Sequence, residues 1–360
     1  MSIWKYADWI APVDSHHRIT LGEGNTPLVR SRSIGPNAGL PNLHFKLEST
    51  NPTGSFKDRF AAAAVSHMLQ AGESEIIATS SGNTGASLAA YAAAAGITSS
   101  IAIVEVAPLG KLLQMLAYGA GIYKVEKFGL DPDVDKRVFR ALKQMGRQPG
   151  CALQVSGYVF CPEGMSGLET VGFELGEQLP EVEHVFVPSG GGGLCVATAR
   201  GFAKLVEQRR LERSPAVHCV QPEGNDTIAT PLREGRDRAR NVECTSKISG
   251  LQVSRVVDGH LAIEACRPTG GTGHTVTDEA IWHVQKRLAR EEGLFVEPAA
   301  AVALTGALQA VERSEVPADA PIVCLLTGIG FKDASAVERM NANVECPTLD
   351  LITLERQATT

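Results

Sequence analysis

The sequence predicts an α/β protein with parallel sheets, and three observations lead to this fold class. Short runs rich in β-branched residues alternate with alanine-rich or amphipathic helical patterns along most of the 360 residues. Glycine-rich segments stand where a strand pattern passes into a helix pattern, as in parallel sheets that bind ligands. Apolar residues make up 44% of the chain and charged residues 21%, so there is ample material for a large core.

The expected elements follow one another as repeated β-α-β units. Strands are predicted at 75–79, 99–106, 122–125, 153–155, 184–188, 217–221 and 322–327. Helices are predicted to begin near Ser55 and to follow at 85–95, 110–118, 133–145, 167–178, 193–208, 278–291 and 298–311. Each such unit joins two parallel strands through a right-handed crossover. The carboxyl ends of the strands therefore gather at one edge of the sheet, where the helix N-termini point.

Composition and charge exclude several classes of protein. A net charge of −6 provides no basic field to attract nucleic acid. No run approaches the roughly 20 apolar residues that span a bilayer, and the N-terminus lacks the apolar run of a secretory signal, so we expect a cytoplasmic protein without membrane contact. The eight cysteines form no CxxC pair, so we expect no metal site and reduced, mostly buried thiols.

The segment from Asn51 to Arg59 holds the first candidate catalytic residue. An Asn-Pro pair and Gly54 predict a turn into an alanine-rich helix, with Lys57 in the first turn of that helix. A lysine is unfavourably placed at this positive end of the helix dipole, and a depressed pKa would leave the neutral amine that Schiff-base chemistry needs. A solvated lysine beside a helix start is the alternative, since most lysines are exposed.

Residues 80–85 form a polar loop between a predicted strand and a predicted helix. Ser81, Asn83 and Thr84 offer hydroxyls and a side-chain amide beside the backbone amides of the helix start. This combination can bind a carboxylate. A capped turn is the alternative interpretation.

Residues 188–194 form a glycine loop at a later junction between a predicted strand and a predicted helix. Four consecutive glycines let the backbone close around a phosphate, and they are costly in backbone entropy without such a purpose. The loop fits neither the Walker pattern nor GxGxxG. A flexible tight turn is the alternative.

Two further glycine-containing segments are weaker indications. Residues 326–330 place Thr327 at the end of a predicted strand, where it either exposes a hydroxyl or belongs to a turn. Residues 269–274 form a second glycine cluster that ends at His274. We interpret His274 as a loop residue rather than a catalytic base, because the sequence suggests no partner for it.

In this order, the segments resemble the fold-type-II pyridoxal-phosphate (PLP) enzymes, and among these they are most similar to the threonine synthases. The similarity extends from 21–28 to 326–333, and residues 52–59, Pro-Thr-Gly-Ser-Phe-Lys-Asp-Arg, match most specifically. The resemblance implies two α/β domains with open, mostly parallel twisted sheets and PLP in the cleft between them.

The resemblance also implies where the domains lie and how the protein assembles. The smaller domain is expected at about 60–160, the larger PLP-binding domain at 1–59 and 161–345, and a C-terminal tail at 346–360. Closure of the cleft on a small amino-acid substrate would exclude water from the reaction. Members of this family usually form homodimers, so the resemblance implies a homodimer.

Each motif receives a role from the resemblance. Lys57 would hold PLP as a Schiff base and later move protons on the substrate, and Phe56 would pack beside the cofactor ring. Asn83 would bind the phenolic oxygen of PLP, and Thr327 would face its pyridine nitrogen with a neutral hydroxyl, which suits elimination over transamination. The other implied ligands are Gly190, Gly191, Gly192 and Gly193 for the cofactor phosphate, and Ser81, Thr84 and Ser156 for the substrate. Glu297 lies in a further family motif at 292–298.

Residues 155–166 depart from the threonine synthase pattern. Cys161 stands where that family has an arginine, and Tyr158 stands where it has an asparagine, whereas Ser156 is retained. Loss of a guanidinium removes the strongest contact that a side chain offers to a phosphate. The glycine loop and residues 248–253 are closer to the serine and threonine dehydratases.

Three reactions are therefore open, all with PLP as cofactor. The leading hypothesis is conversion of O-phosphohomoserine to threonine and phosphate. The alternatives are a serine or threonine dehydratase that yields a 2-oxo acid and ammonia, and β-replacement on an activated serine. A non-catalytic PLP-binding module is disfavoured, because Lys57, Asn83 and the glycine loop occur together.

Overall fold

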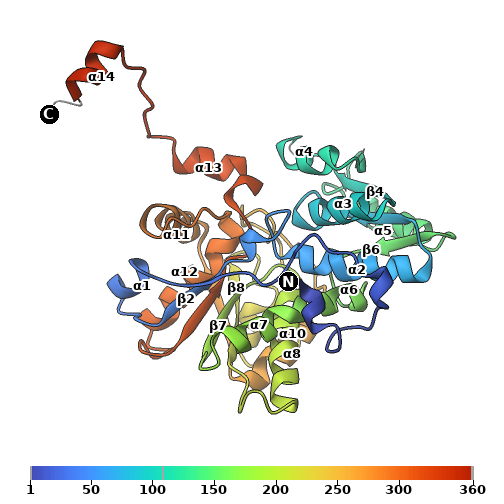
Figure 1. The fold of residues 1–360 in the computed structure, drawn as a ribbon, viewed down its shortest axis with the longest axis horizontal. Coiled ribbons are helices and arrows are strands. Elements are labelled where there is room, and N and C mark those ends of the chain that lie inside the picture. Colours follow the sequence, from blue (N-terminus) through green and yellow to red (C-terminus); the bar gives the residue numbers. More distant parts are fainter. Residues whose placement is uncertain (1, 108, 358–360) are drawn as a thin grey trace.

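The computed structural model describes residues 2–107 and 109–357, and it contains two β-sheets with helices packed around them (Figure 1). The four-stranded sheet lies at one end of the molecule, among the cyan and green elements, and the six-stranded sheet occupies the other end. All strand pairs except one are parallel. The predicted α/β fold class is confirmed.

The four-stranded sheet is wholly parallel, with the strand order β5-β4-β3-β6. Its strands are β3 (Glu75–Thr79), β4 (Thr98–Val104), β5 (Gly121–Val125) and β6 (Cys151–Gln154). The helices between them are α3 (Asn83–Ala95), α4 (Leu109–Ala117) and α5 (Pro132–Met145). All predicted elements of this region are present, and their ends differ from the prediction by only a few residues.

The six-stranded sheet has the order β1-β2-β10-β7-β8-β9. Its strands are β1 (Leu28–Arg30), β2 (Leu43–Lys46), β7 (His184–Pro188), β8 (Ala216–Pro222), β9 (Gly273–Val276) and β10 (Ile322–Leu325). The larger helices around it are α2 (Lys57–Ala71), α7 (Thr170–Gln178), α8 (Gly193–Glu207), α10 (Gly259–Cys266), α11 (Asp278–Glu291) and α12 (Pro298–Glu312). None of the helices in the described part of the chain is long and apolar enough to cross a membrane.

Three expectations need correction. The interpretation of His274 as a loop residue is wrong, because it lies in β9 and pairs in register with Val220 of β8. The single helix predicted at 167–178 is instead α6 (Pro162–Ser166), a 3₁₀ turn (Gly167–Glu169) and α7. Strand β1, at the edge of the six-stranded sheet, and its neighbour β2 were not predicted, and they form the one antiparallel pair among the described strands.

Helix α2 lies between the two sheets and connects their cores (Figure 1). Ala61 to Ala64 of this helix are buried, and such small side chains let neighbouring elements approach closely. One continuous hydrophobic core contains Ile76 of β3, Val65 of α2 and Val187 of β7. The first residue of α2, Lys57, is therefore held by packing against both halves of the molecule.

A buried ionic network fixes the start of α2. The guanidinium of Arg59 lies 2.7 Å from carboxylate oxygens of both Glu48 and Glu174, and Lys46 Nζ lies 2.6 Å from Glu174. These four side chains are at most 4% exposed. Burial alone would raise the pKa of Glu174, but the charge and hydrogen bonds of Arg59, together with Lys46, outweigh it and lower the pKa to about 2.

Three histidines form a hydrogen-bonded chain across β7, β8 and β9. His184 Nδ1 lies 3.0 Å from His218 Nε2, and His218 Nδ1 lies 3.1 Å from His274 Nε2. The backbone N–H of Thr272 also donates to His218 Nδ1, so we assign this nitrogen as an acceptor. It follows that His274 Nε2 donates to His218, that His218 Nε2 donates to His184, and that His274 Nδ1 carries no proton.

The unprotonated Nδ1 of His274 lies near charged groups at the edge of the sheet. It lies 3.5 Å from Glu315 Oε2, and Glu315 is already paired with Arg233. Burial lowers the pKa of His274 to about 4, with Arg233 and Arg313 acting in the same direction and Glu315 against it. The neutral imidazole is therefore the stable form in the folded protein at neutral pH.

We expect His274 to make the unfolding free energy depend on pH. Its folded-state pKa is depressed from 6.5 to about 4, so its contribution is fully present above pH 6.5 and is lost as the pH falls towards 4. The loss amounts to about 3 kcal/mol. Urea denaturation of the wild type and of His274→Gln at several pH values checks this, because the glutamine amide can still donate to His218 but does not titrate. Equal pH dependence of the two proteins would contradict the prediction.

Candidate active site

Lys57 begins α2 between the two sheets. Its Nζ donates a hydrogen bond to Ser156 Oγ at 2.7 Å and lies 4.6 Å from the centre of the Phe56 ring. Burial lowers the pKa of Lys57 to about 8, and the carboxylate of Asp258 acts in the opposite direction. The sequence suggested a depressed pKa because of the helix dipole, whereas burial is the main cause in the structure.

The turn before Lys57 is held by the end of β10 and by Asp58. The N–H of Phe56 donates to the carbonyl of Thr327 at 3.0 Å. The carboxylate of Asp58 accepts hydrogen bonds from both the N–H and the hydroxyl of Thr53, each at 2.6 Å. These bonds leave the first turn of α2 little freedom, so the Lys57 amine is presented from a rigid support.

The N-terminus of α3 approaches the same amine. Thr84 Oγ1 lies 3.0 Å from Ser156 Oγ, so Lys57, Ser156 and Thr84 form one hydrogen-bonded chain. Ser81 is partly exposed in the loop before α3, and no hydrogen bond within the described residues joins its side chain to Lys57. The structure thus brings two of the three predicted substrate-binding residues into direct contact.

Glu297 connects Asn83 to the end of β10. Its Oε1 accepts a hydrogen bond from Asn83 Nδ2 at 2.8 Å. A Cβ added at Gly328 would lie 2.1 Å from the same oxygen, so only glycine allows Glu297 to reach Asn83 past this strand end. Thr327, immediately before Gly328, is buried beside the turn that carries Phe56.

The glycine loop joins β7 to α8. Gly192 has a φ of +98°, in the region that favours glycine, and Gly193 begins the fifteen-residue helix α8. The first N–H groups of a helix have no partner within the helix, and its dipole favours an anion there. Ser189, at the start of the loop, is buried.

Asp258 is a site residue that sequence reasoning missed. Its N–H donates to the carbonyl of Gly191 at 2.9 Å, and its carboxylate accepts hydrogen bonds from the N–H groups of Tyr158 and Val159 at 2.9 and 3.2 Å. Burial raises the pKa of Asp258, and these hydrogen bonds oppose the shift. The residue ties the glycine loop to the chain that follows β6. A single acid directly after two valines, Val256 and Val257, was the available signal.

Tyr158 and Cys161 make buried contacts with other protein groups. The hydroxyl of Tyr158 donates to Glu169 Oε1 at 3.0 Å, and the guanidinium of Arg200 lies 4.4 Å from the centre of its ring. The thiol of Cys161 donates to Gln154 Oε1 at 3.0 Å, and burial raises its pKa to about 12. Neither side chain offers a cation to a phosphate group.

A cavity of about 750 Å³ adjoins the turn before Lys57 but is not lined by Lys57 itself. Phe295 and Phe331 contribute apolar walls, and Lys332 donates a hydrogen bond to Gln114 Oε1 at 2.6 Å. The candidate active site is therefore defined by the hydrogen bonds around Lys57 rather than by this cavity.

The residues around Lys57 fit a cofactor that carries an aldehyde and a phosphate. Lys57 supplies an amine whose pKa lies far below that of an ordinary lysine. The start of α8 supplies N–H groups for a dianion. A Cβ at Gly193 would lie 2.5 Å from the terminal methyl of Met165 and 2.9 Å from a carboxylate oxygen of Asp258, so a larger residue at this point would have to displace these side chains.

Comparison with known proteins agrees with this chemistry. Residues 19–328 match the family described as pyridoxal-phosphate dependent enzyme. The chain is 32% identical to a threonine synthase of Methanocaldococcus jannaschii, over 96% of this chain and 85% of that protein. It is 31% identical to a threonine synthase of Mycobacterium leprae, over 98% and 94% of the two chains.

Solved structures show the same fold at lower identity. A threonine deaminase isoform of Solanum lycopersicum superposes with a TM-score of 0.73 at 23% identity, over 88% of this chain and 82% of that one. Maize serine racemase superposes with a TM-score of 0.70 at 24% identity, over 93% and 92%. The family match covers most of the chain, and the threonine synthase relatives and the shared fold agree with it. The protein therefore belongs to the fold-type-II pyridoxal-phosphate-dependent enzymes and uses pyridoxal phosphate as its cofactor.

Proposed function

We propose that the protein is a PLP-dependent carbon–oxygen lyase of the threonine synthase type that acts on a small amino acid. The observation that supports this most directly is the chain Lys57–Ser156–Thr84, which sets a partly buried amine beside two hydroxyls at the N-terminus of α3. The leading reaction is conversion of O-phosphohomoserine to threonine and phosphate. The threonine synthase relatives support this assignment.

Bound PLP supplies the electron sink for the reaction at the substrate Cα. The amine of Lys57, with its lowered pKa, can take a proton from that carbon and return one near neutral pH. Thr84 and Ser81 at the start of α3 would bind the substrate carboxylate, with Ser156 beside the amine. The glycine loop, Gly190 to Gly193, would hold the cofactor phosphate, while Phe56, Asn83 and Thr327 would orient the ring.

A dehydratase acting on serine or threonine is the second candidate, and one observation favours it. Tyr158 and Cys161, at the positions where threonine synthases carry an asparagine and an arginine, are bonded to Glu169 and Gln154 within the fold. A phosphate on the substrate would therefore lose its expected guanidinium contact. Serine or threonine, which have no phosphate, do not need that contact. β-Replacement on an activated serine is compatible with the same site.

Product analysis distinguishes these reactions. The holoenzyme is incubated separately with O-phosphohomoserine, threonine and serine, and inorganic phosphate, threonine and 2-oxo acids are measured. Phosphate release with threonine formation would establish the leading reaction and would require another cation in place of the missing arginine. A 2-oxo acid from serine or threonine, without phosphate release from O-phosphohomoserine, would establish the dehydratase. Turnover of only an activated serine in the presence of a nucleophile would indicate β-replacement.

We expect the rate of PLP uptake by the cofactor-free enzyme to rise with pH up to about 8 and then to level off. The reason is that only the neutral amine of Lys57 is nucleophilic, and its pKa is lowered to about 8. Stopped-flow absorbance measurements over a range of pH check this. A rate that continues to rise to about pH 10, as for an ordinary lysine, would contradict it.

We also infer that the chain has two domains, a smaller one at about 60–160 and a larger one that combines 1–59 with 161–345. We further infer that the protein is a homodimer and that it is located in the cytoplasm. The separate four-stranded and six-stranded sheets support the division. All eight cysteines are free thiols, in keeping with a reducing compartment. The dimer is supported by the resemblance to a family whose members usually form homodimers. Light scattering of the holoenzyme tests it directly.

A further inference from the structure

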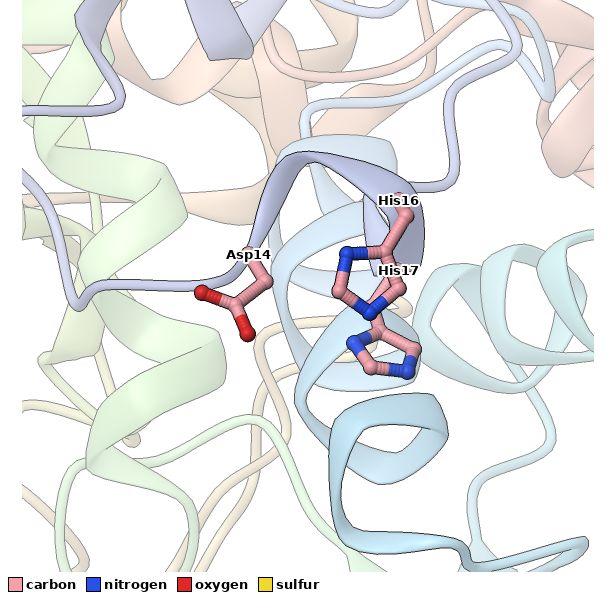
Figure 2. A group of neighbouring side chains, drawn as sticks. All are labelled: Asp14, His16 and His17. Carbon is pink, nitrogen blue, oxygen red and sulfur yellow. The ribbon is translucent and has the colours of Figure 1, made fainter.

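Two histidines and an aspartate gather on a short turn near the N-terminus (Figure 2). The turn is a 3₁₀ helix, η2 (Ser15–His17), and Asp14 precedes it. One candidate ligand atom from each of Asp14, His16 and His17 lies within 4.8 Å of the others. Figure 2 shows the carboxylate and the two imidazole rings close together on one side of the turn.

Hydrogen bonds hold both ends of this turn against α2. The N–H of Asp14 donates to Gln70 Oε1 at 2.7 Å, and the N–H of Ile19 donates to Ser66 Oγ at 2.9 Å. Gln70 and Ser66 both belong to α2, the helix that begins at Lys57. The backbone between the three side chains is thus already ordered, which reduces the entropy that a ligand must overcome.

The two imidazole rings contact each other, with centroids 3.9 Å apart, but the described part of the chain makes little other use of the three side chains. His17 Nδ1 is buried and has no hydrogen-bond partner within the described chain. Asp14 occupies the N-cap of the turn, yet its carboxylate makes no capping hydrogen bond. An aspartate at this position ordinarily bonds the backbone, so a carboxylate that instead lies near two imidazoles needs another explanation.

We propose that Asp14, His16 and His17 form a binding site for one divalent transition-metal ion, Zn²⁺ being the best match. Imidazole nitrogens select Zn²⁺, Cu²⁺ or Ni²⁺ over Mg²⁺ and Ca²⁺, which prefer oxygen ligands. Bonds of about 2.0–2.1 Å in a tetrahedral site place donors roughly 3.4 Å apart, so small side-chain rotations complete the site. Water fills the remaining coordination position.

The site is remote from the chemistry at Lys57 and does not depend on the proposed function. Gln70 stands thirteen residues after Lys57 on α2, which corresponds to about 20 Å along the helix axis. A metal ion here would stiffen the N-terminal segment against α2. Since the three ligands are brought together only in the folded chain, binding favours the folded state.

Two measurements on the untagged, chelator-treated holoenzyme test the proposal. The first is isothermal titration calorimetry with ZnCl₂, and the second is the melting temperature with and without Zn²⁺. We expect one Zn²⁺ per chain, a higher melting temperature with Zn²⁺, and no effect of MgCl₂. His16→Ala and His17→Ala should each weaken binding by more than about tenfold, the lower end of what even outer-shell changes cost at metal sites. His283→Ala, which removes an exposed histidine of α11, is the matched control and should bind as the wild type does.

Several outcomes would overturn the metal site: no saturable binding, unchanged affinity in both histidine variants, or an equal loss in His283→Ala. The melting temperature of each variant without metal and the absorbance of bound PLP show whether it has folded. His16 is exposed, so its variant serves if His17→Ala does not fold. Product formation is read separately, so failure of the lyase assignment and failure of the metal site remain distinguishable.

Discussion

Lys57→Ala is expected to remove the visible absorbance of bound PLP and to lower turnover by at least about four orders of magnitude, the scale seen when an essential nucleophile or base is deleted. Lys57 is the only lysine in the hydrogen-bonded chain with Ser156 and Thr84, and burial gives it a pKa of about 8. Without the amine, no group remains that can bind the cofactor covalently or transfer a proton at the substrate. Absorbance spectra of the purified variant and its product formation check both effects.

Two companion variants separate the possible reasons for the loss. Lys57→Arg retains the positive charge but lacks a nucleophilic amine, so we expect it to fail as completely as the alanine variant. Lys332→Met removes another lysine whose pKa is lowered by burial, and the visible absorbance should persist. A visible band and turnover in Lys57→Ala, or loss of the band in Lys332→Met alone, would show that the cofactor is held elsewhere.

Arg59→Met is expected to lower the unfolding free energy by about 3–5 kcal/mol, the cost of breaking a buried ion pair from one side. The change leaves the carboxylates of Glu48 and Glu174 buried with only Lys46 as a cation. Two like charges in a medium of low dielectric constant repel strongly. Urea denaturation near neutral pH measures the loss, and a triple variant that adds Glu48→Gln and Glu174→Gln should recover part of it.

The Arg59→Met effect should also depend on pH. In the wild type the pKa of Glu174 is lowered from 4.5 to about 2, so its stabilising contribution is present above pH 4.5 and is lost as the pH falls towards 2. The difference between the wild type and Arg59→Met should therefore shrink below pH 4.5.

Lys136→Met is the matched control for the buried network. Lys136 pairs with Asp133 on the surface, where the two side chains are 73% and 85% exposed. We expect a change below about 0.5 kcal/mol, because exposed ion pairs contribute little. If Arg59→Met were no more destabilising than this control, the network would not anchor α2 as described.

The sequence by itself determined the fold class, most of the elements and the position of the lysine that we propose as catalytic. Strands such as β3 and β7 have apolar centres, Ile76 to Ala78 and Val185 to Val187, and a helix follows each within a few residues, so their signal is local. The motifs at Asn83 and Gly190 to Gly193 stand at strand-to-helix junctions, where parallel sheets bind ligands. The two junctions belong to different sheets, because β3 lies in the four-stranded sheet and β7 in the six-stranded sheet, so the sequence predicted each motif but not how they are arranged together.

Only the tertiary structure decided the features that depend on distant partners. β9 is a strand because Gly273 to Val276 pair with β8, although the glycines around it resemble a loop. Asp258, Glu297 and the three histidines acquire their surroundings from elements far away in the chain. Burial, which sets the pKa of Lys57, likewise arises from both sheets at once. These properties come from long-range packing, which a short stretch of sequence does not encode.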